Sequence, residues 1–223
     1  LRVMGQVSYY VWLTKQFTAP INVAIPSGNF GNAYSAWFGR NHGLPINQIL
    51  CSTNVNDVLR RFIDGGVLEP FVTQPSVAPS MDIQIPSSLE RLIFDLSSDA
   101  KSFYGQLQTN SKAQLDEKSV DGLQKVFSSF TFSDENITTL IQSLHDEFAL
   151  VFDPHSVTSV QMALDNDSSL PTVAVATASP EKFGNVISPL IKDFTETKIE
   201  EKEQYLTLST ENAEIIEAIK AFI

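Results

Sequence analysis

A short loop rich in glycine and asparagine is the first part of the sequence whose residue types suit chemistry. It reads Ser27-Gly28-Asn29-Phe30-Gly31-Asn32 and lies between a predicted strand, Ile21–Pro26, and a predicted helix that begins near Ala33. Backbone amides at a helix N-terminus are unpaired and lie at the positive end of the helix dipole, so they suit a phosphate group. Glycines allow the backbone to approach a ligand closely, and asparagine side chains can add donors. The loop is therefore a candidate phosphate-binding site.

The loop does not match the two common nucleotide-binding motifs. It lacks the Gly-Lys-Ser/Thr of a P-loop, and Gly28 and Gly31 do not complete the G-x-G-x-x-G dinucleotide fingerprint. An ordinary glycine-bearing turn before a helix would have the same spacing. Spacing alone therefore leaves both interpretations open.

A second candidate is Thr177, at the carboxyl end of a strand predicted over residues 171–177. Ligands of open α/β sheets bind at that edge, where a threonine hydroxyl could donate a hydrogen bond to a ligand or accept one. Taken alone, Thr177 and Ser179 are better explained as caps of the helix that starts at Ser179-Pro180.

The other reactive side chains do not form a catalytic set. The three histidines, His42, His145 and His155, are scattered, and Cys51 is the only cysteine, so a zinc or iron site is not indicated. His155 follows Asp153-Pro154, which we expect to form the N-cap and first residue of a helix, where most histidines are surface or packing residues. No Gly-x-Ser-x-Gly motif indicates a serine hydrolase.

The elements that would position these residues alternate between strand and helix. Strands are predicted over residues 21–26 and 48–53, each followed closely by a helix, which indicates parallel strands in an α/β fold. Residues 1–17 are predicted to form a helix that is apolar on most faces and therefore buried on several sides. Such a start suggests that an upstream part of the fold is missing from this chain.

The chain is expected to divide into four parts. Residues 1–96 would form part of a large α/β domain, and residues 97–150 a mostly helical insertion. Serine, glutamine, lysine and aspartate dominate residues 97–133, which we expect to lie outside the central sheet. Residues 151–195 would return to the large domain with its last strand and helices, and residues 196–223 would form a charged tail.

Composition restricts the class of protein. The chain carries 15 Lys and Arg against 26 Asp and Glu, a formal net charge of −11, so nonspecific binding to nucleic acid or to an anionic membrane is not expected. No apolar stretch approaches the ~20 residues that cross a bilayer, and the first residues lack the features of a signal peptide. The single cysteine favours a reducing compartment. These features indicate an acidic, globular, cytoplasmic protein.

Six groups of residues, in order along the chain, resemble the threonine synthase family. They cover most of residues 1–191 but not the polar insertion or the acidic tail. The groups are Ile25-Pro26-Ser27-Gly28-Asn29-Phe30-Gly31-Asn32, Gly43-Leu44-Pro45-Ile46, Thr53-Asn54-Val55-Asn56-Asp57 with Arg61-Phe62, Ser80-Met81-Asp82-Ile83 with Leu89-Glu90-Arg91, Asp153-Pro154-His155-Ser156, and Thr177-Ala178-Ser179-Pro180-Glu181-Lys182-Phe183.

This resemblance implies an enzyme that depends on pyridoxal 5'-phosphate (PLP) and has fold type II, that of the tryptophan synthase β subunit. The fold would be a three-layer α/β sandwich around a parallel sheet, incomplete in this chain and carrying a helical insertion. The implied reaction converts O-phosphohomoserine and water to threonine and phosphate, in threonine biosynthesis. Thr177 would hydrogen-bond the pyridine nitrogen of PLP. The phosphate of PLP would be held by Gly28, Asn29, Phe30, Gly31 and Asn32.

The resemblance also implies a catalytic residue outside this chain. The lysine that forms the Schiff base with PLP belongs to a motif upstream of every matching segment, and neither Lys15 nor Lys101 has that context. We therefore expect a C-terminal portion whose partner is the missing N-terminal part of the same protein. Alone it is expected to be inactive.

Two alternatives remain open. Ser179 stands where threonine synthases usually have histidine, and Met81-Asp82-Ile83-Gln84 resembles a segment of the threonine-synthase-like phospho-lyases, which release 2-oxobutyrate. Phe30 and Thr177 favour the synthase instead. Outside the enzymes, the alternative is a non-catalytic phosphate-binding module that kept the sheet.

Overall fold

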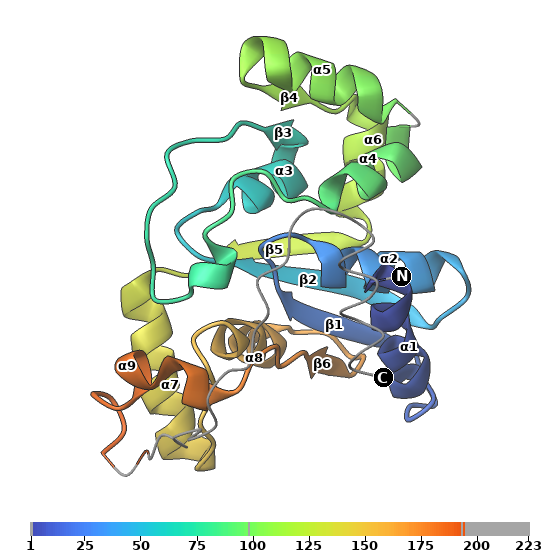
Figure 1. The fold of residues 1–223 in the computed structure, drawn as a ribbon. Coiled ribbons are helices and arrows are strands. Elements are labelled where there is room, and N and C mark those ends of the chain that lie inside the picture. The colour runs from blue at the N-terminus through green and yellow to red at the C-terminus, as the bar shows by residue number, and fades with distance from the viewer. Residues whose placement is uncertain (1, 98, 193, 195–223) are drawn as a thin grey trace, which may run out of the picture.

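The computed structural model describes residues 2–97, 99–192 and 194, and a four-stranded parallel sheet lies at its centre (Figure 1). The strand order is β5-β2-β1-β6, with all three pairings parallel. The strands are β1 (Ile21–Pro26), β2 (Ile46–Thr53), β5 (Phe127–Thr131) and β6 (Thr172–Ala174). β1 is almost wholly buried and rich in apolar residues, as parallel strands covered on both faces are. The predicted α/β fold with a parallel sheet is confirmed.

Helices cover both faces of this sheet. They are α2 (Gly31–Asn41), α3 (Val58–Gly65) and α8 (Ser156–Asp165). Cys51 of β2 points to the face of α2 and α3, where it joins a core that contains Trp37 and Phe62. Ser52, the next residue, points to the opposite face, where its hydroxyl lies 2.6 Å from that of Thr158 on α8. The expected three layers are therefore present.

The order in which the chain forms the strands places a crevice at the carboxyl ends of β1 and β6. From β1 the chain passes through α2 to β2 and through α3 towards β5 on one face, then returns through α8 to β6 on the other. Right-handed crossovers require this change of face when the direction reverses. Neighbouring strands whose helices lie on opposite faces leave a crevice at their carboxyl ends, where ligands of open α/β sheets bind.

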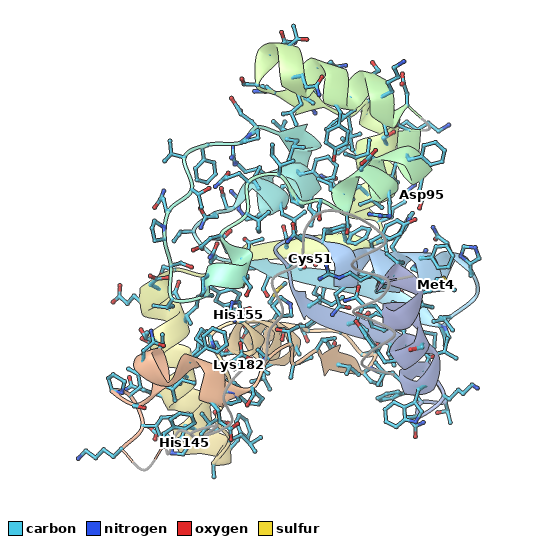
Figure 2. The ribbon with its side chains drawn as sticks, viewed as in Figure 1. Met4, Cys51, Asp95, His145, His155 and Lys182 are labelled. Atoms are coloured by element: carbon cyan, nitrogen blue, oxygen red, sulfur yellow. The ribbon has the colours of Figure 1, made fainter. Side chains whose placement is uncertain are left out.

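A smaller group of elements lies beyond α3, above the sheet in Figure 1. It consists of α4 (Leu89–Ser97), α5 (Ala100–Asn110), α6 (Glu117–Gln124) and the antiparallel pair β3 (Val67–Leu68) and β4 (Ala113–Gln114). Asp95 of α4, labelled in Figure 2, accepts hydrogen bonds from the Tyr34 hydroxyl at 3.2 Å and the Trp37 indole at 3.1 Å. These bonds connect the group to α2.

The expectation that residues 97–133 lie outside the central sheet was wrong, because they include β5, which pairs with β2. The sequence Phe-Ser-Ser-Phe-Thr is polar because β5 is an edge strand. Phe127 points into the core, whereas the side chain of Phe130 is 57% exposed. The proposed boundaries of the four parts stay a prediction, and the tail over residues 196–223 lies outside the described residues.

A second hydrophobic cluster forms at the opposite end of the molecule from α5. Its elements are η1 (Pro79–Met81), α7 (Asp134–Phe148), η2 (Pro180–Phe183) and α9 (Gly184–Ile187). α7 begins with a capping box in which Ser133 and Asn136 each accept a hydrogen bond from the other's backbone amide. This long helix agrees with the mostly helical character expected for residues 97–150.

The first helix, α1 (Arg2–Thr14), is present but less buried than expected. Only Tyr10 and Thr14 are buried among its described residues, while Met4 (Figure 2) is 58% and Trp12 65% exposed. α1 packs on α2 along one side, so the expectation of burial on several sides was wrong for this structure. Among the described residues, no helix is long and apolar enough to cross a membrane.

The core beneath α3 gives a prediction for stability. Phe62 is fully buried and meets Phe103 edge to face at 6.1 Å between ring centroids. Because Phe62→Ala removes a ring from a packed core, it should lower the free energy of unfolding by about 3–5 kcal/mol in urea denaturation. Phe94→Ala is the matched control, since that side chain is 60% exposed. Equal losses for the two variants would contradict the packing described here.

Candidate functional site

The loop over residues 27–32 follows β1 directly and forms the N-terminus of α2. Ser27 still belongs to the sheet, because its amide donates to Ser52 O at 2.9 Å. Phe30 is the N-cap residue, has a left-handed backbone with φ of 66°, and makes no side-chain capping bond. Within the described part of the chain, the backbone amides from Gly28 to Asn32 have no hydrogen-bond acceptor. They form a row of free donors at the positive end of an eleven-residue helix.

Two glycines keep this end of the helix open. A Cβ atom added to Gly28 would lie 2.2 Å from the carbonyl oxygen of Ser80, so only glycine fits beside that segment. A Cβ added to Gly31 would meet Gln6 Oε1 at 3.4 Å and Ser88 Oγ at 3.5 Å, which is ordinary contact. Gly28 is therefore required by packing, whereas the absence of a side chain at Gly31 leaves space in front of the amides.

The side chains of the loop have roles that differ from one another. Phe30 is buried and packs on Phe127 with ring centroids 5.6 Å apart, so its backbone alone reaches the loop surface. Asn29 accepts from the amide of Ser88 through its backbone carbonyl oxygen at 3.0 Å and from the amide of Ser87 through its side-chain Oδ1 at 3.4 Å. Asn32 Oδ1 accepts from both the Tyr9 and Tyr10 hydroxyls at 2.5 and 2.6 Å. Asparagine here fixes the loop to its neighbours.

A pocket of about 570 Å³ opens in front of the loop. Gly28, Asn29, Phe30, Gly31, Asn32 and Thr177 all line it, so the structure brings every residue of the predicted site together. Its position, at the carboxyl ends of β1 and β6, is the crevice that the strand order creates.

Thr177 lies three residues beyond β6, with its amide donating to Ser156 Oγ at 2.9 Å. Ser179 is the N-cap residue of η2, as expected, but its side chain makes no capping bond and instead donates to Glu181 Oε2 at 3.2 Å. Thr177 is exposed and lines the pocket. Its hydroxyl is therefore available to a ligand.

Sequence reasoning missed one wall of the pocket. Arg2, Gln6 and Tyr9 of α1 line it together with Ser80 and Ser88. Arg2, Gln6 and Tyr9 are spaced i, i+4 and i+7 and so share one helix face. The spacing of these three polar residues within an otherwise apolar helix is the sequence feature from which this wall of the pocket could have been predicted.

Tyr9 and Tyr10 are held in their protonated, hydrogen-donating form. Burial raises the pKa of Tyr9 to about 12 and raises the pKa of Tyr10 well above its ordinary value. Both hydroxyls can therefore donate to Asn32 at neutral pH. This pair of bonds attaches α1 to the first turn of α2.

Asp153 and His155 form a buried pair beside the pocket. Figure 2 shows His155 next to η2, the turn that carries Lys182, and its ring meets Phe183 at 4.9 Å. The Ser80 amide donates to His155 Nε2 at 3.1 Å, so the ring proton must lie on Nδ1, which donates to Asp153 Oδ1 at 2.8 Å. The pair therefore holds Ser80, the residue that packs against Gly28.

The expected N-cap role of Asp153 was wrong. α8 starts at Ser156, and the N-cap is His155 without a side-chain bond. Asp153 instead accepts from the His155 amide at 2.9 Å, in a turn that precedes the helix. The carboxylate thus orients the imidazole rather than the helix.

Metal and thiol chemistry find no support in the described part of the chain. No group of three or more His, Cys, Asp or Glu side chains there could hold a metal ion. Cys51 is fully buried in the sheet, and burial raises the pKa of its thiol to about 12, so the reactive thiolate is not formed at neutral pH.

The chain is similar in sequence to proteins named threonine synthase and threonine synthase-like 1. No protein-family model matches the chain. The chain is 32% identical to threonine synthase from Pseudomonas aeruginosa over 195 residues, covering 83% of this chain and 42% of that protein. It is 30% identical to human threonine synthase-like 1 over 207 residues, covering 86% of this chain and 28% of that protein.

A solved structure of a threonine synthase is also similar to this chain. A PLP-bound threonine synthase from Brucella melitensis has a TM-score of 0.84 and 27% sequence identity, covering 98% of this chain and 50% of that one. This likeness agrees with the predicted fold type. The chain spans about half the length of the threonine synthases that it resembles.

The contact between Gly28 and Ser80 gives a second prediction. Gly28→Ala places a methyl group against a backbone oxygen and must displace the segment around Ser80, so it should lower the free energy of unfolding by about 1–3 kcal/mol. Gly5→Ala is the control, because nothing lies within 4 Å of a Cβ at Gly5 and alanine favours a helix. Urea denaturation measures both, and an unchanged stability of Gly28→Ala would contradict the close approach.

A third prediction concerns pH. Burial alone would raise the pKa of Asp153, but hydrogen bonds from His155 and Ser156 outweigh it and leave that pKa below its ordinary value. A carboxyl whose pKa is lower in the folded than in the unfolded state contributes stability above its unfolded pKa, and this contribution is lost as pH falls through the folded pKa. Asp153→Asn should therefore be less stable than the parent by about 1–3 kcal/mol at neutral pH. The difference should shrink below about pH 4.

Urea denaturation of both proteins at several pH values measures this difference. Asp167→Asn, at an exposed carboxylate, is the control and should show no deficit at either pH. A deficit for Asp153→Asn that is the same at neutral and acid pH would show that the carboxylate charge is not what stabilises the pair.

Proposed function

Because this chain resembles threonine synthases in sequence and in fold, we propose that the protein carrying it is a PLP-dependent enzyme of threonine biosynthesis. Its reaction converts O-phosphohomoserine and water to threonine and phosphate. The observation that carries the proposal is the row of unpaired amides from Gly28 to Asn32, which faces Thr177 across one pocket. When bound, PLP supplies the electron sink for chemistry at the β and γ carbons of an amino acid.

The loop has the properties that a phosphate dianion needs. Its amides are directed donors at a helix N-terminus, and Gly28 and Gly31 have no side chains that would cover them. Asn29 and Asn32 are bonded to neighbouring elements, which keeps the loop in a single shape. These residues would hold the phosphate of PLP at the carboxyl end of β1.

Thr177 would position the other end of the cofactor. Its hydroxyl can donate to the pyridine nitrogen, and the bond from its amide to Ser156 fixes its backbone. A neutral hydroxyl, unlike a carboxylate, leaves that nitrogen largely unprotonated. PLP with an unprotonated pyridine nitrogen would withdraw electrons less strongly than PLP with a protonated one.

The covalent attachment of PLP would come from outside this chain. The pocket lining includes Arg2 but no lysine, and Lys15 and Lys101 lie elsewhere. We propose that an N-terminal part of the same protein supplies that lysine, and that the chain alone is inactive. We also propose a cytoplasmic enzyme for a small-molecule substrate, without nucleic acid or membrane as partner, because the chain is acidic and its one thiol is reduced and buried.

Ser179 supports an alternative product. It replaces the histidine usual in threonine synthases, and it lies two residues beyond Thr177 in the segment that follows β6. A phospho-lyase would release 2-oxobutyrate from O-phosphohomoserine instead of threonine. Product analysis of the full-length enzyme decides: we expect threonine as the main product, whereas 2-oxobutyrate without threonine would assign the lyase.

A fourth prediction tests the phosphate site itself. A Cβ at Gly31 makes only ordinary contacts, but a larger side chain would extend into the pocket in front of the amides. Gly31→Leu should therefore weaken PLP binding by the full-length protein at least about tenfold, the loss expected from one charge-assisted hydrogen bond. Absorbance titration with PLP measures the affinity.

Gly105→Leu is the matched control, since a Cβ at Gly105 on α5 has nothing within 4 Å. It should bind PLP as the parent does. Unchanged PLP affinity in Gly31→Leu would refute the assignment of the phosphate to this loop. A parent protein that binds phosphate esters but turns over no substrate would instead support the non-catalytic module.

A further inference from the structure

The turn that precedes α8 is hydrogen-bonded to two separate parts of the pocket lining. His155 Nε2 accepts from the Ser80 amide at 3.1 Å, and Ser156 Oγ accepts from the Thr177 amide at 2.9 Å. Ser80 and Thr177 both line the pocket, whereas His155 and Ser156 do not. Two adjacent residues of one buried turn therefore hold two pocket residues that lie far apart in the sequence.

The imidazole of His155 has no nitrogen left for a ligand. Its Nε2 accepts from Ser80, and its Nδ1 donates to Asp153 Oδ1 at 2.8 Å. His155 borders a smaller cavity of about 170 Å³ beside the pocket, but it is only 4% exposed, and the ring of Phe183 lies against it. An effect of His155 on a ligand must therefore pass through Ser80.

Ser80 transmits this hold to the loop over residues 27–32. Its carbonyl oxygen lies where a Cβ at Gly28 would meet it at 2.2 Å, so the two backbones are in close contact. In a packed interior, a segment this close cannot shift without moving its neighbour. The position of Ser80 therefore decides where the amide of Gly28, the first of the unpaired donors, is placed.

We propose that His155 and Ser156 are positioning residues for the two ends of the bound cofactor. His155 acts through Ser80 on the loop that would hold the phosphate. Ser156 acts through Thr177, whose hydroxyl would meet the pyridine nitrogen. Because the two residues are adjacent in one turn, they fix the distance between these two contacts. The inference rests on the proposed function and adds residues that do not themselves contact the cofactor.

Glutamine and asparagine separate the two hydrogen bonds of His155. The side-chain amide of glutamine reaches as far as Nε2 and can accept from Ser80, whereas that of asparagine reaches only as far as Nδ1 and can keep only the bond to Asp153. His155→Gln thus retains the hold on Ser80, and His155→Asn loses it. His42→Asn is the matched control, because His42 is exposed at the end of α2 and lies outside the pocket lining.

The test measures the affinity of the full-length protein for PLP and for pyridoxal, which lacks the phosphate, by absorbance titration. His155→Asn should weaken PLP about tenfold, the effect of one misplaced hydrogen bond to a charged group, and leave the affinity for pyridoxal unchanged. His155→Gln should recover most of this loss, and His42→Asn should bind both ligands as the parent does. Equal losses for PLP and pyridoxal, no recovery in His155→Gln, or no loss in His155→Asn would overturn the role of His155.

Ser156→Ala tests the other end and decides the proposal if circular dichroism shows that His155→Asn does not fold. It removes the acceptor of the Thr177 amide and leaves His155 in place. Because both ligands contain the pyridine ring, PLP and pyridoxal should weaken by the same factor, about fivefold for one neutral hydrogen bond. Ser143→Ala, at an exposed serine of α7, is the control and should change neither affinity. An effect of Ser156→Ala that is absent or confined to PLP would contradict the proposal.

The two proposals can fail separately. If the parent binds PLP and Gly31→Leu loses it, while the variants of His155 and Ser156 bind both ligands as the parent does, only the inference about the turn falls. If the parent does not bind PLP, the proposed function falls and takes this inference with it.

Discussion

The N-terminus of α2 imposes the constraint on which the rest of the site depends. The first amides of a helix cannot bond within it, and here Phe30 adopts a left-handed backbone at the N-cap without offering a side-chain acceptor. Buried in protein, such donors would be costly, so the end of the helix must meet water or an anion. Gly28 and Gly31 keep it uncovered, and the strand order places it at the crevice between β1 and β6. A phosphate pairs the donors and is favoured by the helix dipole.

Two polar networks fix the shape of the pocket, one centred on Asp82 and one on the pair Asp153 and His155, and none of these three side chains lines it. The carboxylate of Asp82 accepts from the side-chain amides of Asn54 at 2.6 Å and Asn56 at 2.9 Å and from the Ser76 hydroxyl at 2.7 Å. Beside it, Ser80 is held by the bond to His155. Both networks position the segment over residues 76–82, whose backbone lies against Gly28. The carboxyl ends of β1 and β2 and the start of α8 are thereby connected around one loop.

The local part of this arrangement could be predicted from sequence, and the non-local part could not. The loop over residues 27–32 shows its role because glycine spacing and the change from strand to helix are adjacent in the chain. β5 was missed because Phe-Ser-Ser-Phe-Thr does not alternate apolar and polar residues, although the burial of its side chains does alternate. The α1 wall was missed because the apolar residues of that helix dominate its pattern, and only the packing against α2 shows which face carries Arg2 and Gln6. The contact of Gly28 with Ser80 joins residues far apart in sequence and likewise appears only in the fold.

The most direct measurement of the central claim is the response of the backbone amide resonances of residues 28–32 to PLP, in nitrogen–proton correlation spectra of the full-length protein. Amides that donate to a phosphate move downfield, so those of Gly28, Asn29, Gly31 and Asn32 should shift together as the cofactor is added. Saturation of these shifts should follow the same affinity as the change in absorbance. Binding of PLP that leaves the four amides unmoved while resonances elsewhere shift would show that the cofactor phosphate is held by another part of the protein.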